Sequence, residues 1–312
     1  MPAQPARSVK EMRRYGCLTV ACLAAVICLT GCGAGRIAGT PVSETTPAQA
    51  PNARAVTTPG HATNARAALN RWRDFPVQAN PRPIVPLGEG IVLDPSGGFP
   101  DAAGKLAYFE GRFALGAALP AGPGAAGRYR VIPAAAAYRA LRATGRAEHE
   151  KVAPLIVTAV RLGQARFATD RGPASLPAWQ FYFRGMADPA SVLALAPPAL
   201  FMPPALSRFA PPGPGNSVEL SATASRSGTV LTLSFPGPLP GTGPCAASYR
   251  ASVLGDRRAV AVTIATTSPA VPSGVACPAV AVTRTAVVRL ARPLGSRVLV
   301  SATDGGAIPV TG

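Results

Sequence analysis

Two segments of low sequence complexity limit where this chain can build a folded domain. Residues 33–70 are mainly Ala, Thr, Pro, Asn and Gly, so they hold too little apolar surface to offset the entropy lost on ordering. The segment APPALFMPPALSRFAPPGPG (196–215) holds seven prolines, and proline can neither rotate about φ nor donate to a β-ladder. The chain is therefore predicted to contain a flexible tether at 32–70, an α+β domain at 71–195, a stiff Pro-rich linker at 196–215 and a β-rich domain at 216–312.

The first residues have the form of an export signal. Arg7, Lys10, Arg13 and Arg14 precede the stretch Gly16–Thr30, which carries no charge. A basic start followed by a short apolar run is typical of a secretory signal peptide, and about 15 residues is short of the roughly 20 that a membrane span needs. We predict a signal peptide at 1–31. The arginine pair leaves twin-arginine export open, but no bulky apolar pair follows it, which favours the general secretory route.

The apolar run ends in the motif Leu29-Thr30-Gly31-Cys32, which resembles the lipobox of bacterial lipoproteins. The resemblance implies cleavage between Gly31 and Cys32 and a diacylglyceryl thioether on Cys32. Thiolate is a strong nucleophile, which suits this acylation chemistry. The protein is then expected on the outer face of the cytoplasmic membrane, anchored by its acyl chains. The alternative is an ordinary cleaved signal with an incidental cysteine.

Two cysteines remain in the mature chain, Cys245 and Cys277. An isolated pair in an oxidising compartment usually forms a disulfide, so we predict that these two are bonded. A metal or redox pair is the alternative. It lacks a CxxC spacing, and the last histidine of the chain is His149.

The charge of the chain is strongly positive, with 31 basic and 14 acidic residues and a formal net charge of +17. Nearly all the cations are arginine, which GC-rich codon usage alone produces. The functional interpretation is long-range attraction to anionic lipid headgroups or anionic wall polymer. Nucleic acid is not an expected partner, because the arginines are scattered rather than interleaved with aromatic residues.

The first domain shows a helix followed by a hairpin. VIPAAAAYRALRATG predicts a helix that begins at Pro133 and ends before Gly145. APLIVTAVRLGQARFATD (153–170) predicts a strand with a bulge at Gly163, and LPAWQFYFRG (176–185) predicts its partner. Helix, strand, turn and strand together favour a helix on an antiparallel sheet. The stretch 97–113 is left open between a short strand and a short helix.

Three residues of this hairpin are candidates for binding. Trp179 shares a strand face with Phe181 and Phe183, which predicts core packing against the helix; an exposed platform for stacking is the alternative. Asp170 and Arg171 form the turn TDRGP, where Asp170 accepts local hydrogen bonds; ligand contact at the hairpin tip is the alternative. The hairpin resembles small extracytoplasmic modules of the PepSY and cystatin-like kind over about 55 residues. That resemblance implies a binding or regulatory module.

The second domain has no helical periodicity. Turn signals stand at RSG (226–228) and GD (255–256), and alternation places Leu231 with Leu233, and Val260 with Val262, on shared faces. A small antiparallel sandwich or open barrel is predicted. The strands are expected at Ser217–Ala224, Thr229–Phe235, Ala247–Leu254, Ala259–Thr267, Thr283–Leu290 and Arg297–Ser301. The mature chain as a whole resembles secreted lipoproteins of high-GC Gram-positive bacteria, a resemblance that implies no activity.

The sequence offers few groups for catalysis or metal binding. His61 and His149 stand alone, and the chain lacks GxSxG and P-loop motifs. We therefore expect no enzyme activity, no metal and no cofactor. Paired carboxylates that would hydrolyse a wall polymer are the alternative, with Glu89, Asp94, Asp101 and Glu110 as candidates.

These features favour a lipid-anchored extracytoplasmic protein that binds or interacts at the cell envelope. Its expected partners are the lipid of the cytoplasmic membrane, reached through Cys32, and an anionic wall polymer or an envelope protein. Wall-polymer hydrolysis and envelope assembly are the alternatives.

Overall fold

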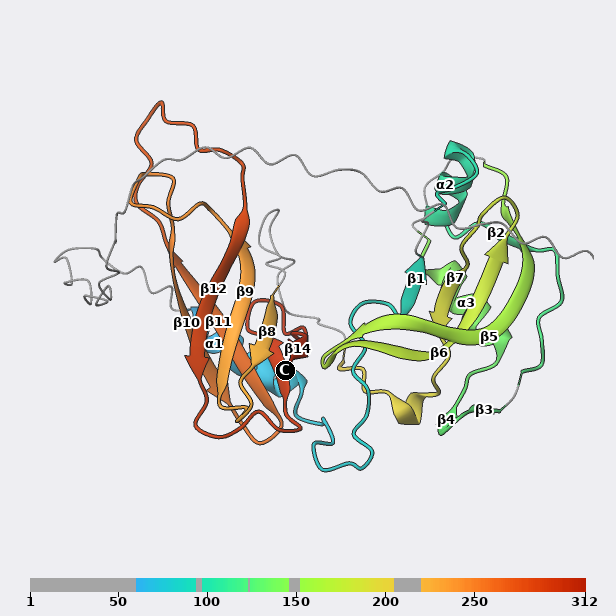
Figure 1. Ribbon diagram of the computed structural model, residues 1–312, viewed down its shortest axis with the longest axis horizontal. Helices are drawn as coiled ribbons and strands as arrows, with labels where there is room; N and C mark the ends of the chain where they lie inside the picture. Colours follow the sequence, from blue (N-terminus) through green and yellow to red (C-terminus); the bar gives the residue numbers. More distant parts are fainter. Residues whose placement is uncertain (1–59, 94–96, 123, 146–151, 205–219) are drawn as a thin grey trace, which may run out of the picture. The chain divides into compact units, whose positions relative to one another are not determined.

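The computed structural model describes residues 60–93, 97–122, 124–145, 152–204 and 220–312 (Figure 1). All of them fall within the compact unit Arg54–Gly312. The chain is α+β, as predicted, with three α-helices and fourteen β-strands in the described residues. None of the helices in these ranges is both long and apolar enough to cross a membrane.

A long hairpin forms the centre of the first sheet. Its strands, β5 (Leu155–Thr169) and β6 (Gly172–Phe183), are joined by a turn at Asp170 and Arg171, so the second strand begins four residues before the predicted start at Leu176. Figure 1 shows these two strands curving together. The sheet order is β1-β7-β6-β5-β2, and only β2 joins its neighbour in parallel. The remaining strands of this sheet are β1 (Ile91–Leu93), β2 (Phe113–Leu115) and β7 (Ala190–Leu193).

The bulge predicted at Gly163 is wrong. Gly163 pairs in register with Ala178, and the register of the hairpin shifts instead between Val157 and Ala159. The side chain of Gln180 lies over Gly163, where a Cβ would come within 2.6 Å of its Oε1.

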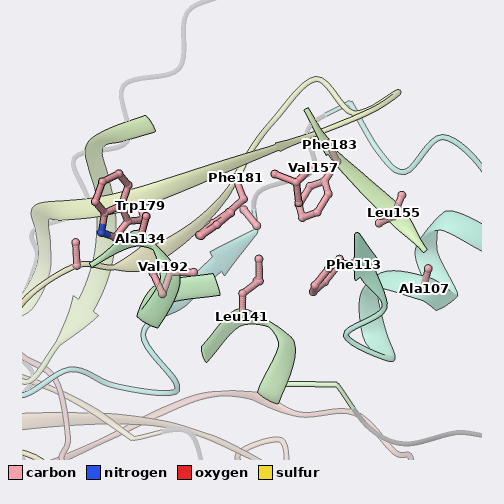
Figure 2. Packing of buried hydrophobic residues seen from close by; sticks show 13 residues of the cluster. Ala107, Phe113, Ala134, Leu141, Leu155, Val157, Trp179, Phe181, Phe183 and Val192 are labelled. Carbon is pink, nitrogen blue, oxygen red and sulfur yellow. The ribbon is translucent and has the colours of Figure 1, made fainter. Parts of the chain in front are cut away.

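Two helices contribute side chains to the core of this sheet. In α3 (Ala134–Ala143), Ala134, Ala137 and Leu141 are buried, and Pro133 is the N-cap residue, one position before the helix. Figure 2 shows Leu141 pointing from its helix toward Phe181. The stretch left open by the sequence forms α2 (Ala102–Phe109), whose first turn is capped by the carboxylate of Asp101. The short strands β3 (Ala125–Ala126) and β4 (Tyr129–Arg130) pair with each other.

The β-rich domain is a sandwich of two sheets, ordered β10-β11-β13 and β12-β9-β8-β14. Leu231 and Leu233 of one sheet share a buried cluster with Val260 and Val262 of the other, so the predicted faces are confirmed. The sandwich is not wholly antiparallel, because β13 runs parallel to β11 and β14 parallel to β8. The strands are β8 (Ser221–Ala224), β9 (Val230–Gly237), β10 (Ser248–Gly255), β11 (Ala259–Thr267), β12 (Val282–Arg289), β13 (Val298–Ser301) and β14 (Val310–Thr311).

The helix α1 (Gly60–Arg71) lies, except for its last residue, inside the range 32–70 that the sequence predicted as a flexible tether. Its buried Ala65 and Ala68 share a cluster with Ala259 of β11 and Val298 of β13. Alanine side chains let the helix backbone approach the sheet closely, which a sequence rich in alanine does not reveal by itself. A segment far upstream in the chain therefore completes the core of the β-rich domain.

The start of the predicted Pro-rich linker is also packed. After the short 3₁₀ turn η1 (Pro197–Ala199), the ring of Phe201 lies 5.5 Å from the ring of Trp72 and 5.1 Å from that of Phe75. Residues 205–215 of the linker lie outside the described ranges.

Candidate functional site

The predicted lipidation site lies outside the described residues. Gly31, Cys32 and the whole signal 1–31 belong to this part of the chain, as do Asp94 and His149. The anchor stays a prediction from the motif alone.

Cys245 and Cys277 form the predicted disulfide, with their Cα atoms 5.4 Å apart. Cys245 precedes β10 and Cys277 precedes β12, so the bond joins the loop between β9 and β10 to the loop between β11 and β12. Both loops leave the sandwich at the same end, because Gly237 pairs with Val282 and Ser248 pairs with Thr267.

Trp179 belongs to the core. Its side chain is 1% exposed, and its indole Nε1 donates to the carbonyl oxygen of Ile132 at 2.8 Å. Phe181 and Phe183 are buried in the same cluster (Figure 2). A ring in this position has no exposed face on which a ligand could stack. Trp179 instead joins β6 to the segment just before α3.

Asp170 and Arg171 lie at the hairpin tip, where both side chains bind other groups of the protein. Asp170 is 2% exposed, and its carboxylate pairs with Arg82 through both oxygens and with Arg171 at 3.7 Å. Arg171 donates at 2.7 Å to the carbonyl oxygens of Gly295 and of Arg297. Burial lowers the pKa of Arg171, Arg82 lowers it further, and Asp170 opposes the shift. The tip therefore fastens the hairpin to the β-rich domain.

The strongest candidate site is a basic cleft of about 590 Å³ beside the end of α3. Arg139 and Arg142 come from α3, three positions apart and thus on one side of the helix. Arg112 comes from the residue before β2, and Glu110 supplies the one carboxylate of the lining. We name these four residues the arginine cleft.

Two glycines bring the parts of the arginine cleft together. A Cβ at Gly111, whose φ is +64°, would lie 2.4 Å from the carbonyl oxygen of Arg142. A Cβ at Gly145 would lie 2.2 Å from the carbonyl oxygen of Glu110. Any larger residue would push the end of α2 away from the end of α3, so the two glycines allow Glu110 to approach the helix that carries the arginines.

Glu110 is the most unusual group of the cleft. Its side chain is 3% exposed, and Oε2 lies 3.4 Å from Nη1 of Arg112. Its Oε1 is buried without a hydrogen-bond partner in the described part of the chain. Buried carboxylate oxygens are normally satisfied, so such an atom calls for a functional or structural reason.

A second hollow, of about 600 Å³, adjoins the cleft at Glu110. Glu89, Tyr108 and Phe109 also line it, and burial raises the pKa of Tyr108 to about 12. Of the four predicted catalytic carboxylates, Glu89 and Glu110 therefore share one hollow. Asp101 instead accepts a hydrogen bond at 2.6 Å from the backbone of Gly104 at the start of α2.

In the ranges that the structure describes, no three His, Cys, Asp or Glu residues gather in a way that could hold an ion. No protein-family model matches the chain, and no curated protein or solved structure matches it either.

The sequence patterns indicated Glu110 as a candidate but none of the arginines of the cleft. Three guanidinium groups against one carboxylate leave an excess of positive charge. Guanidinium binds phosphate and carboxylate through paired hydrogen bonds, which are among the stronger polar contacts in proteins. The cleft is therefore suited to an anionic group. The spacing of Arg139 and Arg142 was the available signal, and the abundance of arginine hides it.

Proposed function

We propose that this protein is a lipid-anchored extracytoplasmic binding protein whose arginine cleft holds an anionic group of an envelope polymer. The observation that supports the proposal is the gathering of Arg112, Arg139 and Arg142 around one cleft whose single acid is buried. The partner is a wall polymer that carries phosphate or carboxylate. The protein acts as a binding protein without a cofactor.

The arginines of α3 are placed to receive such a group. Arg139 and Arg142 are exposed, and no described residue forms an ion pair with either guanidinium. Arg112 differs, because Glu110 lies beside it and it has further interactions. An incoming anion would therefore meet two guanidinium groups that pair with no acid among the described residues, next to a third that is already positioned.

The test is binding of a phosphate-containing wall polymer by the variant Arg139→Ala/Arg142→Ala. We expect its affinity to fall by about tenfold or more, since each hydrogen bond to a charged group contributes roughly 1.5–3 kcal/mol. The matched control is Arg161→Ala/Arg166→Ala, which removes the same charge from exposed positions of β5. Isothermal calorimetry at fixed salt measures both. Equal losses in the two double variants would show that only net charge matters and would refute the cleft.

A second candidate function is hydrolysis of the polymer, because Glu89 and Glu110 line the same hollow. Two carboxylates on either side of a glycosidic bond suffice for that reaction. The same polymer samples distinguish hydrolysis from binding alone. Reducing ends that appear with the wild type but not with Glu89→Gln would favour the hydrolase, and an unchanged polymer favours binding alone.

The anchor has its own test, which does not depend on the cleft. The variant Cys32→Ala offers no thiol for acylation, so we expect the protein to leave the membrane fraction. Double acylation is stable in a bilayer, whereas a protein without acyl chains has no comparable hold. Immunoblots of membrane and soluble fractions measure the change. Because another part of the protein could also hold the variant at the membrane, acylation is measured directly: labelled palmitate should enter the wild type and not Cys32→Ala, and a labelled variant would contradict the anchoring proposal.

A further inference from the structure

Two loops at one end of the β-rich sandwich carry no charged residue. The two loops there are 238–247, between β9 and β10, and 268–281, between β11 and β12. The sequence has no charged residue from 227 to 249 or from 259 to 283, although the chain has a net charge of +17. We call these two loops the disulfide-tied end, because the Cys245–Cys277 bond joins them.

Aliphatic side chains project from this end into solvent. Leu239 is 46% exposed, Val271 49%, Val275 42% and Val280 53%. Every residue from 271 to 280 is exposed. Clustered exposed apolar side chains mark an interaction surface more often than chance does.

The base of the disulfide-tied end carries arginine and tyrosine. Arg284 donates from Nη1 to the carbonyl oxygen of Pro238 at 3.2 Å, and its guanidinium lies 5.3 Å from the centre of the Tyr249 ring. Arg250 is exposed on β10, next to Tyr249 in the sequence. Asp256 lies beyond the far end of β10, in the hairpin to β11, so its carboxylate is remote from the two loops.

We propose that the disulfide-tied end inserts into the surface of an anionic lipid bilayer. Aliphatic tips enter the acyl boundary, and the arginines at the base meet anionic headgroups, an arrangement common to interfacial membrane-binding elements. Tyr249 lies beside Arg284 at the base of the loops, and an amphipathic ring is favoured at a membrane interface. A protein partner is the weaker match, because the cores of protein interfaces are enriched in aromatic residues and arginine, and these loop tips carry neither.

The disulfide contributes to this role by holding the two loops together before contact. A pre-ordered surface pays less entropy on binding than two independent loops do. The surface does not require the acyl anchor, so its test can omit Cys32. The compact unit Arg54–Gly312 contains all the described elements, so a chain that starts at residue 33 retains the folded part.

The experiment measures partition of the chain from residue 33 onto vesicles of phosphatidylglycerol and phosphatidylcholine, with phosphatidylcholine vesicles as the neutral comparison. We expect binding to the anionic vesicles to be stronger. The variant Val275→Asp/Val280→Asp should lower the partition coefficient by at least about tenfold, since burying one valine side chain corresponds to roughly that factor. The matched control is Val287→Asp on β12, where the valine is 61% exposed but outside the loops, and its partition should equal that of the wild type.

A second measurement reports insertion directly. The emission of Val275→Trp should shift to shorter wavelength when anionic vesicles are added, and that of Val287→Trp should not. The proposal would be overturned by unchanged binding of Val275→Asp/Val280→Asp or by an unshifted emission of Val275→Trp. It would also be overturned if the wild type bound neither kind of vesicle. Sedimentation without lipid tests whether the loops instead bind a second copy of the chain. A dimer that the double variant abolishes would show this and would also overturn the proposal.

Discussion

Replacement of Asp170 by alanine is expected to lower the free energy of unfolding by about 3–5 kcal/mol, the range for removing one partner of a buried ion pair. The carboxylate is 2% exposed and is the counter-charge of Arg82, whose side chain is 19% exposed, and of Arg171. Without it, two guanidinium groups repel each other in a site with little water. The loss is therefore larger than the value of one hydrogen bond.

Urea denaturation, followed by circular dichroism, measures this loss. The matched control is Asp74→Ala, since Asp74 forms an ion pair with Arg73 in which both side chains are about 70% exposed. Exposed pairs contribute roughly 0–1 kcal/mol, so the control should change little. Similar losses at both positions would contradict the account of a buried, charge-balanced hairpin tip.

The hairpin tip also shows what local sequence could and could not predict. TDRGP was recognised as a turn between two predicted strands, and the chain does turn at Asp170 and Arg171, although β6 already begins at Gly172. Arg82 was not recognised, since it lies 88 residues upstream in a Pro-rich stretch without periodicity. Turn chemistry is local and readable, whereas the partner of a buried charge is fixed by the tertiary fold.

The same distinction holds for the β-rich domain and the candidate site. The six predicted strands match β8 to β13 within a few residues, because alternation and turn residues act over short distances. The cysteine pair was predictable because only two remained after the lipobox. The arginine cleft was not, since it depends on Gly111 and Gly145 bringing two helix ends together, and glycines of this kind resemble the many others in the chain.

Replacement of Trp72 by alanine is expected to destabilise the protein by about 3–5 kcal/mol, the usual range for large-to-small changes at a buried aromatic residue. Trp72 is 1% exposed, and its indole Nε1 donates at 2.9 Å to the carbonyl oxygen of Gly305, in the turn after β13. Its ring also contacts Phe75 and Phe201, with the centroids 6.2 and 5.5 Å away. Three stretches of the chain thus meet at one side chain.

Two further variants separate the contributions of Trp72. Trp72→Phe keeps an aromatic ring but loses the hydrogen bond to Gly305, so about 1–2 kcal/mol of the loss should remain. Met202→Ala serves as the control, because Met202 is 62% exposed beside Phe201, and its change should stay within about 0.5 kcal/mol. Urea midpoints of the three variants give the comparison. If Trp72→Ala were no more harmful than Met202→Ala, the segment after α1 would not belong to the core of the β-rich domain.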